Sequence, residues 1–203
     1  MKKINKNFKS SKLIFTISIL VVTLCIAYRL FKYYSNIKSL KISNELSDTY
    51  KLISTYSNSK NSSTPNFISL NSYQIIGKIE IPKLDIKYPI ISYVTYENLK
   101  IAPCRFSGPL PNEIGNVCIA GHNYNNNKFF SNISKLNNKD IIKIFDVYDN
   151  YVLYEVYSIY EVNDSDLSVL NQNIYNYREL TLVTCNNYNN KRTIVKAKET
   201  NYY

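Results

Sequence analysis

The sequence predicts a mainly β fold, an eight-stranded barrel with short helices, preceded by a transmembrane helix and a helical stalk. From Tyr73 onward, short β-branched and aromatic runs alternate with turns rich in Asn, Gly and Pro. Residues 13–31 instead form one long apolar run, and residues 36–56 carry an apolar stripe at helical spacing. About eight strands in roughly 130 residues favour a closed barrel, because closure leaves no strand edge unpaired.

The basic charge of the chain lies around the apolar run. The net charge is +10 over 203 residues. Residues 1–31 contain six basic and no acidic residues, and residues 32–60 contain five and two. The remainder is close to neutral, with fourteen basic and thirteen acidic residues, and has no basic stripe. Binding to nucleic acid is therefore not expected.

The run LIFTISILVVTLCIAYRLF, residues 13–31, predicts a single-pass signal anchor. As a helix it would reach about 28 Å, close to the roughly 30 Å of a hydrocarbon core. A cleaved signal peptide and a lipoprotein are the alternatives, but no Ala-x-Ala-like site follows the run, and Leu24 rather than a small residue precedes Cys25. Five lysines before the run predict residues 1–12 as a cytoplasmic tail and an extracellular domain at the cell membrane.

Between the anchor and the barrel, residues 32–72 predict a stalk helix followed by a linker. Apolar residues recur there at spacings of three and four, typical of a helix that packs on the domain or on a neighbouring molecule: Ile42, Leu46, Tyr50 and Ile53. Residues 57–72 are rich in Ser and Asn and contain Pro65, as linkers often are. We therefore expect the barrel domain to occupy residues 73–203.

The barrel segments follow from period-two alternation and from turn residues. Strands are expected at 74–81, 85–91, 116–121, 140–145, 151–162, 180–184 and 193–197. Short helical pieces are expected at 97–101, 128–136 and 164–170, and loops at 106–115 and 123–127.

Cys185 closes one predicted strand, and Arg192 opens the next after six intervening residues. Alternation places Cys185 on the face opposite Leu180 and Leu182, away from the core that those leucines need. If the two strands are neighbours, both side chains lie beside the mouth of the connecting loop. An arginine there favours the thiolate, and it can donate hydrogen bonds to an oxyanion on a carbonyl carbon attached to Cys185.

His122, the only histidine, closes the apolar run NVCIAGH. A cysteine nucleophile needs an imidazole within hydrogen-bond reach, so we hypothesise that His122 approaches Cys185 and serves as general acid and base. Each of the three residues alone would more often be structural or solvated. The hypothesis of one catalytic site therefore rests on the occurrence of all three residues together.

A metal site made of Cys104, Cys118, His122 and Cys185 is a weaker interpretation. Cys118 and His122 stand four residues apart on one predicted strand, about 13 Å, which is too far for one tetrahedral ion. Cys104 and Cys118 are expected as two buried thiols, with a disulfide as the alternative.

Several motifs resemble, in order, those of the sortases, which are membrane-anchored cysteine transpeptidases of Gram-positive bacteria. IGKIEIPKLDIKYPI resembles their first two strands, GPLPNEIGNVCIAGH the segment that ends in the catalytic histidine, and KFFSNISKLNNKDII the helix and strand after it. LTLVTC resembles the TLxTC signature and KRTIVKA the arginine strand, so the resemblance covers roughly residues 73–198. It implies a catalytic sortase barrel with a triad of Cys185, His122 and Arg192, and a substrate groove beside Thr184, Ala120 and Gly121.

The resemblance also implies a reaction and its partners. Cys185 would cleave the Thr–Gly bond of an LPxTG-like sorting signal through a thioacyl enzyme, which an amine of a cell-wall precursor or a pilin would resolve. No cofactor is expected. Calcium is the alternative, because some class A sortases bind it near the position of Glu161, Asp164 and Asp166, although three acids in a loop are usually solvated.

Two features bear on the class of enzyme. We see no long N-terminal lid with a DPW- or DPF-like motif, which disfavours a pilin-polymerising class C enzyme and leaves a class A-like, a D-like or a divergent housekeeping sortase open. The connection 186–191 is shorter than in many sortases, so we expect this enzyme to differ from its relatives in substrate preference there.

Two other functions are alternatives to this one. The first is another cysteine acyl-transfer enzyme of the cell wall. Papain-like wall hydrolases place cysteine before histidine, and L,D-transpeptidases hold the two in an SHGC-like stretch, whereas His122 precedes Cys185 by 63 positions. The second is a non-catalytic, membrane-tethered binding module, which would leave the three motifs unexplained.

Overall fold

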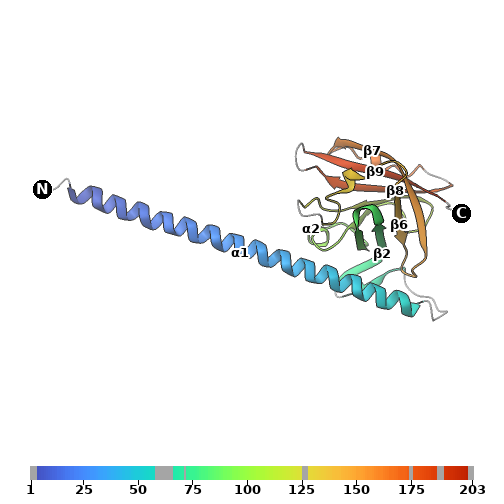
Figure 1. Ribbon diagram of the computed structural model, residues 1–203, viewed down its shortest axis with the longest axis horizontal. Helices are drawn as coiled ribbons and strands as arrows, with labels where there is room; N and C mark the ends of the chain where they lie inside the picture. Colours follow the sequence, from blue (N-terminus) through green and yellow to red (C-terminus); the bar gives the residue numbers. More distant parts are fainter. Residues whose placement is uncertain are drawn as a thin grey trace. The chain divides into compact units, whose positions relative to one another are not determined.

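A computed structural model describes residues 4–57, 66–70, 72–124, 128–173, 176–186 and 190–200. The chain divides into two compact units, Met1–Lys41 and Ile42–Tyr203. Helix α1 (Ile4–Ser57) makes up the described part of the first unit, and its C-terminal part belongs to the second (Figure 1). The described residues of the predicted tail, anchor and stalk helix, from Ile4 to Ser57, thus belong to one helix.

The N-terminal part of α1 has an apolar surface of the kind found in membrane-spanning helices. The stretch Leu13–Asp48 contains an 18-residue window with a mean hydropathy of 2.3 and is long and apolar enough to cross a membrane. Its large apolar side chains from Leu13 to Leu30 are at least half exposed. Such a surface matches a hydrocarbon environment, and within a helix every backbone polar group is satisfied internally. This agrees with the predicted membrane anchor.

The part of α1 in the second unit packs on the barrel domain. Leu46 is 1% exposed and lies in an apolar cluster with Ile75, Ile91 and Ile101. Ser43, one turn earlier, is buried as well. The stalk helix therefore contacts its own domain. The side chains of the other two stripe residues, Tyr50 and Ile53, lie outside the described residues.

Eight strands close into a barrel, as predicted. They follow the order β2-β3-β4-β5-β8-β9-β7-β6, and β6 pairs back onto β2. Their bounds are β2 (Tyr73–Ile81), β3 (Ile86–Ile91), β4 (Cys104–Ser107), β5 (Gly115–Ala120), β6 (Ile141–Phe145), β7 (Tyr151–Asn163), β8 (Arg178–Cys185) and β9 (Lys191–Glu199). A ninth strand, β1 (Ile68–Leu70), adds to the edge of β2 inside the stretch expected to be linker.

Most neighbouring strands pair antiparallel, but β3 and β4 pair parallel, and so do β5 and β8. Because parallel neighbours end at the same edge of a sheet, the C-terminal ends of β5 and β8 meet. Strands β8, β9 and β7 lie side by side (Figure 1), so the start of β9 reaches the same edge. This arrangement brings three distant segments of the chain together.

Alternation divides these strands into an inner and an outer face. Leu180 and Leu182 of β8 enter the barrel core with Val117 and Ile119 of β5 and with Val195 of β9. The residues between them point outward and carry the candidate site. Placing Cys185 opposite the two leucines was therefore correct.

The short helices differ from the sequence expectation in two places. The helix expected over 128–136 reduces to a 3₁₀ turn, η2 (Ile133–Lys135), because Phe129 has a φ of 51° and cannot continue a right-handed helix. Its apolar face, Phe129, Ile133 and Leu136, is nevertheless buried as expected. The helix over 164–170 likewise shortens to η3 (Ser168–Leu170).

The other short elements lie close to the positions expected from the sequence. The helical turn near 97–101 is α2 (Tyr96–Leu99), capped by the hydroxyl of Thr95, which accepts from Asn98 N. Pro82 opens the 3₁₀ turn η1 (Pro82–Leu84) between the first two barrel strands. The loop expected from 106 to 115 begins with the end of β4, a strand that was not expected from the sequence.

Candidate active site

Cys185 is the last residue of β8 and the exposed cysteine of the barrel domain. Cys104 and Cys118 are buried free thiols. Their strands pair out of register for a disulfide, since Cys104 faces Ala120 and Cys118 faces Ser107. Burial raises the pKa of Cys104 to about 12 and that of Cys118 to about 11, so both stay protonated near neutral pH. Cys185 is therefore the thiol that a solute can reach.

Arg192 is the register partner of Cys185 on the neighbouring strand β9. Paired residues of adjacent strands project to the same face with Cβ atoms about 5 Å apart. The Arg192 Nε donates to the backbone oxygen of Asp164 at 3.0 Å, which fixes the direction of the guanidinium. The observed pairing of Cys185 with Arg192 thus agrees with the spacing argument from the sequence.

His122 follows the end of β5 and comes level with Cys185. The last residue pair between the parallel strands joins Ala120 to Val183, and His122 and Cys185 each lie two residues further on. The imidazole packs against the ring of Tyr124, with centroids 4.9 Å apart. Partial burial, and secondly the positive charge of Lys100, hold the pKa of His122 below its ordinary value. The neutral imidazole therefore predominates at pH 7.

Three hydrogen bonds join the His122 segment to the end of β8. Gly121 N donates to Val183 O at 3.0 Å, and the Thr184 hydroxyl donates to Gly121 O at 2.7 Å. The Asn123 side-chain amide donates to Cys185 O at 2.8 Å. These bonds flank His122 on both sides in sequence, so they set its position relative to Cys185.

The three predicted groove residues occupy different environments. Ala120 is half-buried at the end of β5, beside His122. Gly121 is buried, and a Cβ there would lie 2.6 Å from a ring carbon of Phe130. Thr184 is buried on the face opposite Cys185, where its hydroxyl supports Gly121. Contact of these residues with a substrate stays a prediction.

Sequence reasoning did not identify Asn123 and Lys100. Asn123 contacts Cys185 across 62 positions, and only its place directly after the histidine could have drawn attention to it. Lys100 follows α2, pairs with Glu97 at 3.0 Å and lies over the ring of Tyr96. No sequence pattern connected it to the site.

The connection after Cys185 is held at its base by a bond from Asn186 N to Lys191 O of 2.7 Å. The Asn186 side chain also contacts Glu161 on β7. Residues 187–189 lie outside the described part of the chain. The expectation that this short loop sets substrate preference therefore stays a prediction.

Among the described residues, neither the cysteine–histidine metal site nor the calcium site has a suitable arrangement of ligands. Within them, no three His, Cys, Asp or Glu side chains gather as a metal site requires. Of the three acids considered for calcium, Asp166 accepts instead from the backbone N of Ser168 at 2.9 Å. The pKa of Asp166 lies below its usual range, first because of a side-chain hydrogen bond with Ser168 and secondly because of this backbone bond.

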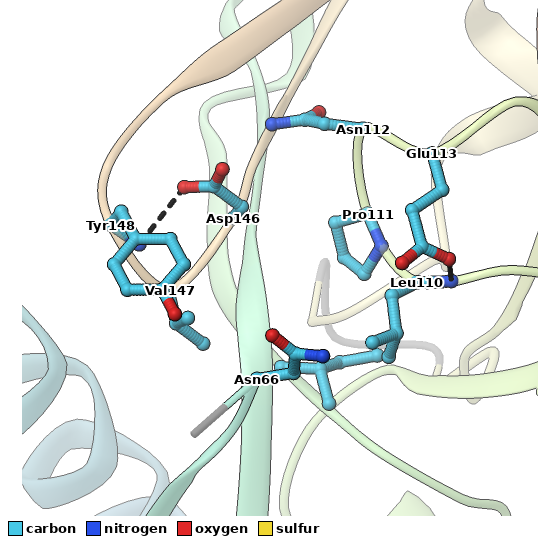
Figure 2. A pocket seen from close by; sticks show the side chains of 9 residues that line it. Asn66, Leu110, Pro111, Asn112, Glu113, Asp146, Val147 and Tyr148 are labelled. Carbon is cyan, nitrogen blue, oxygen red and sulfur yellow. Dashed lines mark hydrogen bonds between the residues drawn. The ribbon is translucent and has the colours of Figure 1, made fainter. Parts of the chain in front are cut away.

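A cavity of about 210 Å³ lies elsewhere on the barrel (Figure 2). Its wall includes Asn112, whose backbone oxygen accepts a hydrogen bond from the Arg178 side chain. Arg178 is the first residue of β8, and Cys185 is the last. The seven-residue separation amounts to about 23 Å of strand. Two carboxylates in the wall, Glu113 and Asp146, accept backbone N–H groups of their own turns, so they serve local structure.

The closed barrel, with an exposed cysteine paired to an arginine and level with a histidine, defines a cysteine-dependent acyl-transfer enzyme. The comparisons narrow this class. Residues 79–200 match the sortase domain, and the chain belongs to the sortase family. It is thus a cysteine transpeptidase of cell-wall anchoring. No curated protein sequence matches it.

Solved structures agree with this assignment. A Clostridium perfringens sortase D5 transpeptidase is 31% identical, with a TM-score of 0.59 over 83% of this chain and 99% of that one. Sortase A from Corynebacterium diphtheriae, a lid mutant, is 23% identical with a TM-score of 0.59 over 79% and 97%. Sortase C from C. perfringens with a C-terminal cell wall sorting motif is 22% identical with a TM-score of 0.57 over 84% and 90%. The latter two show a shared fold.

Proposed function

We propose that this enzyme cleaves an LPxTG-like sorting signal between Thr and Gly and joins the new carboxyl end to an amine. The observation that carries the proposal is the register of β5, β8 and β9, in which Cys185 faces Arg192 and His122 comes level with both. The solved sortase C that contains a cell wall sorting motif supports a sorting signal as donor.

In the first half-reaction, the Cys185 thiolate attacks the threonine carbonyl carbon. A C–S bond forms and the carbonyl oxygen becomes an oxyanion, which the Arg192 guanidinium stabilises by charge-assisted hydrogen bonds. When the oxyanion collapses, the C–N bond breaks and protonated His122 gives its proton to the departing glycine amine. The products are a thioacyl enzyme and a peptide with a free amino terminus.

In the second half-reaction, the acceptor amine attacks the same carbon. Neutral His122 takes the proton from the amine, the C–S bond breaks and the thiolate of Cys185 returns. The acceptor is an amine of a cell-wall precursor or of a pilin. The low pKa of His122 suits this step, since the base form is already present at pH 7.

The anchor helix would keep this chemistry at the membrane surface, where secreted substrates emerge. We propose residues 1–12 as the cytoplasmic tail, 13–31 as the membrane span, 32–72 as stalk and linker, and 73–203 as the extracellular catalytic domain. The five lysines ahead of the span support that orientation.

A positional library of quenched LPxTG-type peptides tests the donor. The wild type is expected to cleave one group of related sequences between Thr and Gly and to release more acyl product when an amine is added. Cys185→Ala should abolish cleavage, and Arg192→Lys should lower kcat/KM at least about a hundredfold, as for other lost oxyanion donors. A His122→Ala variant with full activity would refute the assigned triad.

A further inference from the structure

The outer face of β5, β8 and β9 continues well beyond the reactive residues. By register, Cys185 and Arg192 form its first row, and Val183 and Ile194 the second. The third row contains Thr181 and Lys196. The polar residues in and next to the third row are buried, although they point away from the barrel core: Asn116, Glu179, Thr181 and Lys196.

The residues that cover these rows belong to the connection between β7 and β8. We call residues 164–173 the covering segment. Its start accepts the hydrogen bond from Arg192 Nε at Asp164 O. Five residues later, Val169 packs against Val183 and Ile194 in the second row. The covering segment therefore begins at the reactive pair and extends along the outer face.

Its far end is held by a buried ammonium group. Lys196 Nζ donates to Val169 O at 3.0 Å and pairs with Glu179 Oε1 at 2.7 Å. The Asn116 side-chain amide donates to the same Val169 oxygen and to Asn171 O, both at 3.2 Å. The Thr181 hydroxyl in turn donates to Asn116 Oδ1 at 2.7 Å. Two donors thus converge on one backbone oxygen of the covering segment.

Stability alone does not account for this choice of residues. A buried ion pair is often no more stabilising than apolar side chains of similar volume, because desolvation offsets the attraction. What an apolar pair cannot do is donate to Val169 O. The ammonium fixes that oxygen in space, and Glu179 neutralises the charge that does so.

We propose that Lys196, neutralised by Glu179, is a positioning residue that fixes the covering segment as one wall of the donor-peptide groove. This rests on the proposed function, since it assigns the donor peptide to the side of Cys185 where the segment begins. Two fixed points, Asp164 O at Arg192 and Val169 O at Lys196, hold the residues between them beside the reactive pair.

The decisive variant is the double substitution Lys196→Met with Glu179→Met in the full-length protein in detergent. It removes the Lys196 bond to Val169 O, keeps the Asn116 bond to the same oxygen and leaves no unpaired buried charge. We expect an unchanged or higher Tm, an increase in KM for the cleaved peptide of about tenfold, and little change in kcat. The rate and pH profile of Cys185 alkylation by iodoacetamide should match the wild type, because the reactive pair is untouched.

Lys198→Met is the matched control. Lys198 lies two residues further along the same face of β9 and contacts the rings of Tyr157 and Tyr177 instead of the covering segment. It should leave KM unchanged. Lys196→Arg keeps a donor and a charge beside Glu179, and it should recover part of the lost affinity.

Hydrogen exchange separates this proposal from the proposed function. In the double variant, amides of residues 164–173 should exchange faster while those of the barrel core do not, whether or not any peptide is cleaved. A double variant with wild-type KM and wild-type exchange in that segment would overturn the positioning role. Failure of the wild type to cleave any peptide, with the exchange result intact, would instead overturn the proposed donor and its groove.

Discussion

At the scale of single residues, the environment of His122 sets the protonation state of the proposed general acid and base. Partial burial and the charge of Lys100 both disfavour the imidazolium, so the pKa of His122 is lowered. The protonated acid needed for the first half-reaction therefore becomes abundant only as the pH falls. The neutral base needed for the second is present near pH 7.

Replacing Lys100 by Met tests the contribution of charge. Removing a nearby positive charge should raise the pKa of His122 and move the His122-dependent limb of the kcat/KM profile to higher pH. Because the chain has one histidine, its Cε1 proton can be followed directly by NMR titration. Lys198→Met, at a distance from the imidazole, is the control. An unchanged His122 titration in Lys100→Met would show that burial alone sets the pKa.

The Thr184 hydroxyl gives a second test at this scale. Thr184→Val keeps the shape but leaves Gly121 O without its 2.7 Å donor in a buried setting. An unsatisfied buried oxygen costs about 1–3 kcal/mol of unfolding free energy, to be measured by urea denaturation. The activity should fall as well, since Gly121 precedes His122. Thr200→Val, just beyond β9, should change neither; an equally stable Thr184→Val protein would show that the bond contributes nothing.

At the scale of elements, the sequence predicted those strands whose alternation is regular and long. β8 is the clearest case, because Leu180 and Leu182 required one face and left the other for Cys185. β4 was missed because its four residues form a single bridge to β3 and follow Pro103, which gives little local signal. The helix over 128–136 failed for a different reason. Its apolar spacing was correct, but the positive φ of Phe129 breaks the helix, and spacing does not reveal backbone conformation.

The site could be predicted only in part for a related reason. Cys185 and Arg192 lie on consecutive strands, so local alternation was enough to pair them. The approach of His122 to Cys185 was implied only by the resemblance, through the triad. It depends on the parallel pairing of β5 with β8, which the sequence analysis did not predict. Asn123 and Lys100 act through contacts between distant segments, and nothing in their own sequence surroundings marks them.

The stalk part of α1 is the element whose docking can be tested most simply. Leu46→Ala should cost about 2–5 kcal/mol of stability in the barrel domain, because the side chain is 1% exposed among isoleucines. Thermal unfolding would measure this cost. Glu45→Ala, exposed on the same turn, is the matched control and should have little effect. Equal melting temperatures for the two variants would mean that the helix does not stabilise the domain.

At the scale of the whole molecule, one apolar helix and one barrel combine an anchor with a reactive edge. The barrel fixes the site by closing eight strands so that the ends of β5 and β8 and the start of β9 meet. None of the three residues of the proposed triad belongs to the barrel core, and the thiols of Cys104 and Cys118 are buried. This separation lets the strands stabilise the fold while their ends carry the chemistry.

The central claim is that Cys185 forms a thioacyl bond to the threonine carbonyl of a sorting signal. Its most direct test is intact-mass analysis of the full-length protein after mixing with an LPxTG-type peptide, followed by mapping of the modified residue. We expect the wild-type mass to increase by the acyl fragment that ends in threonine, with the label on Cys185 and none on Cys185→Ala. An acyl label on Cys185→Ala, or no adduct on the wild type with any peptide of the library, would contradict it.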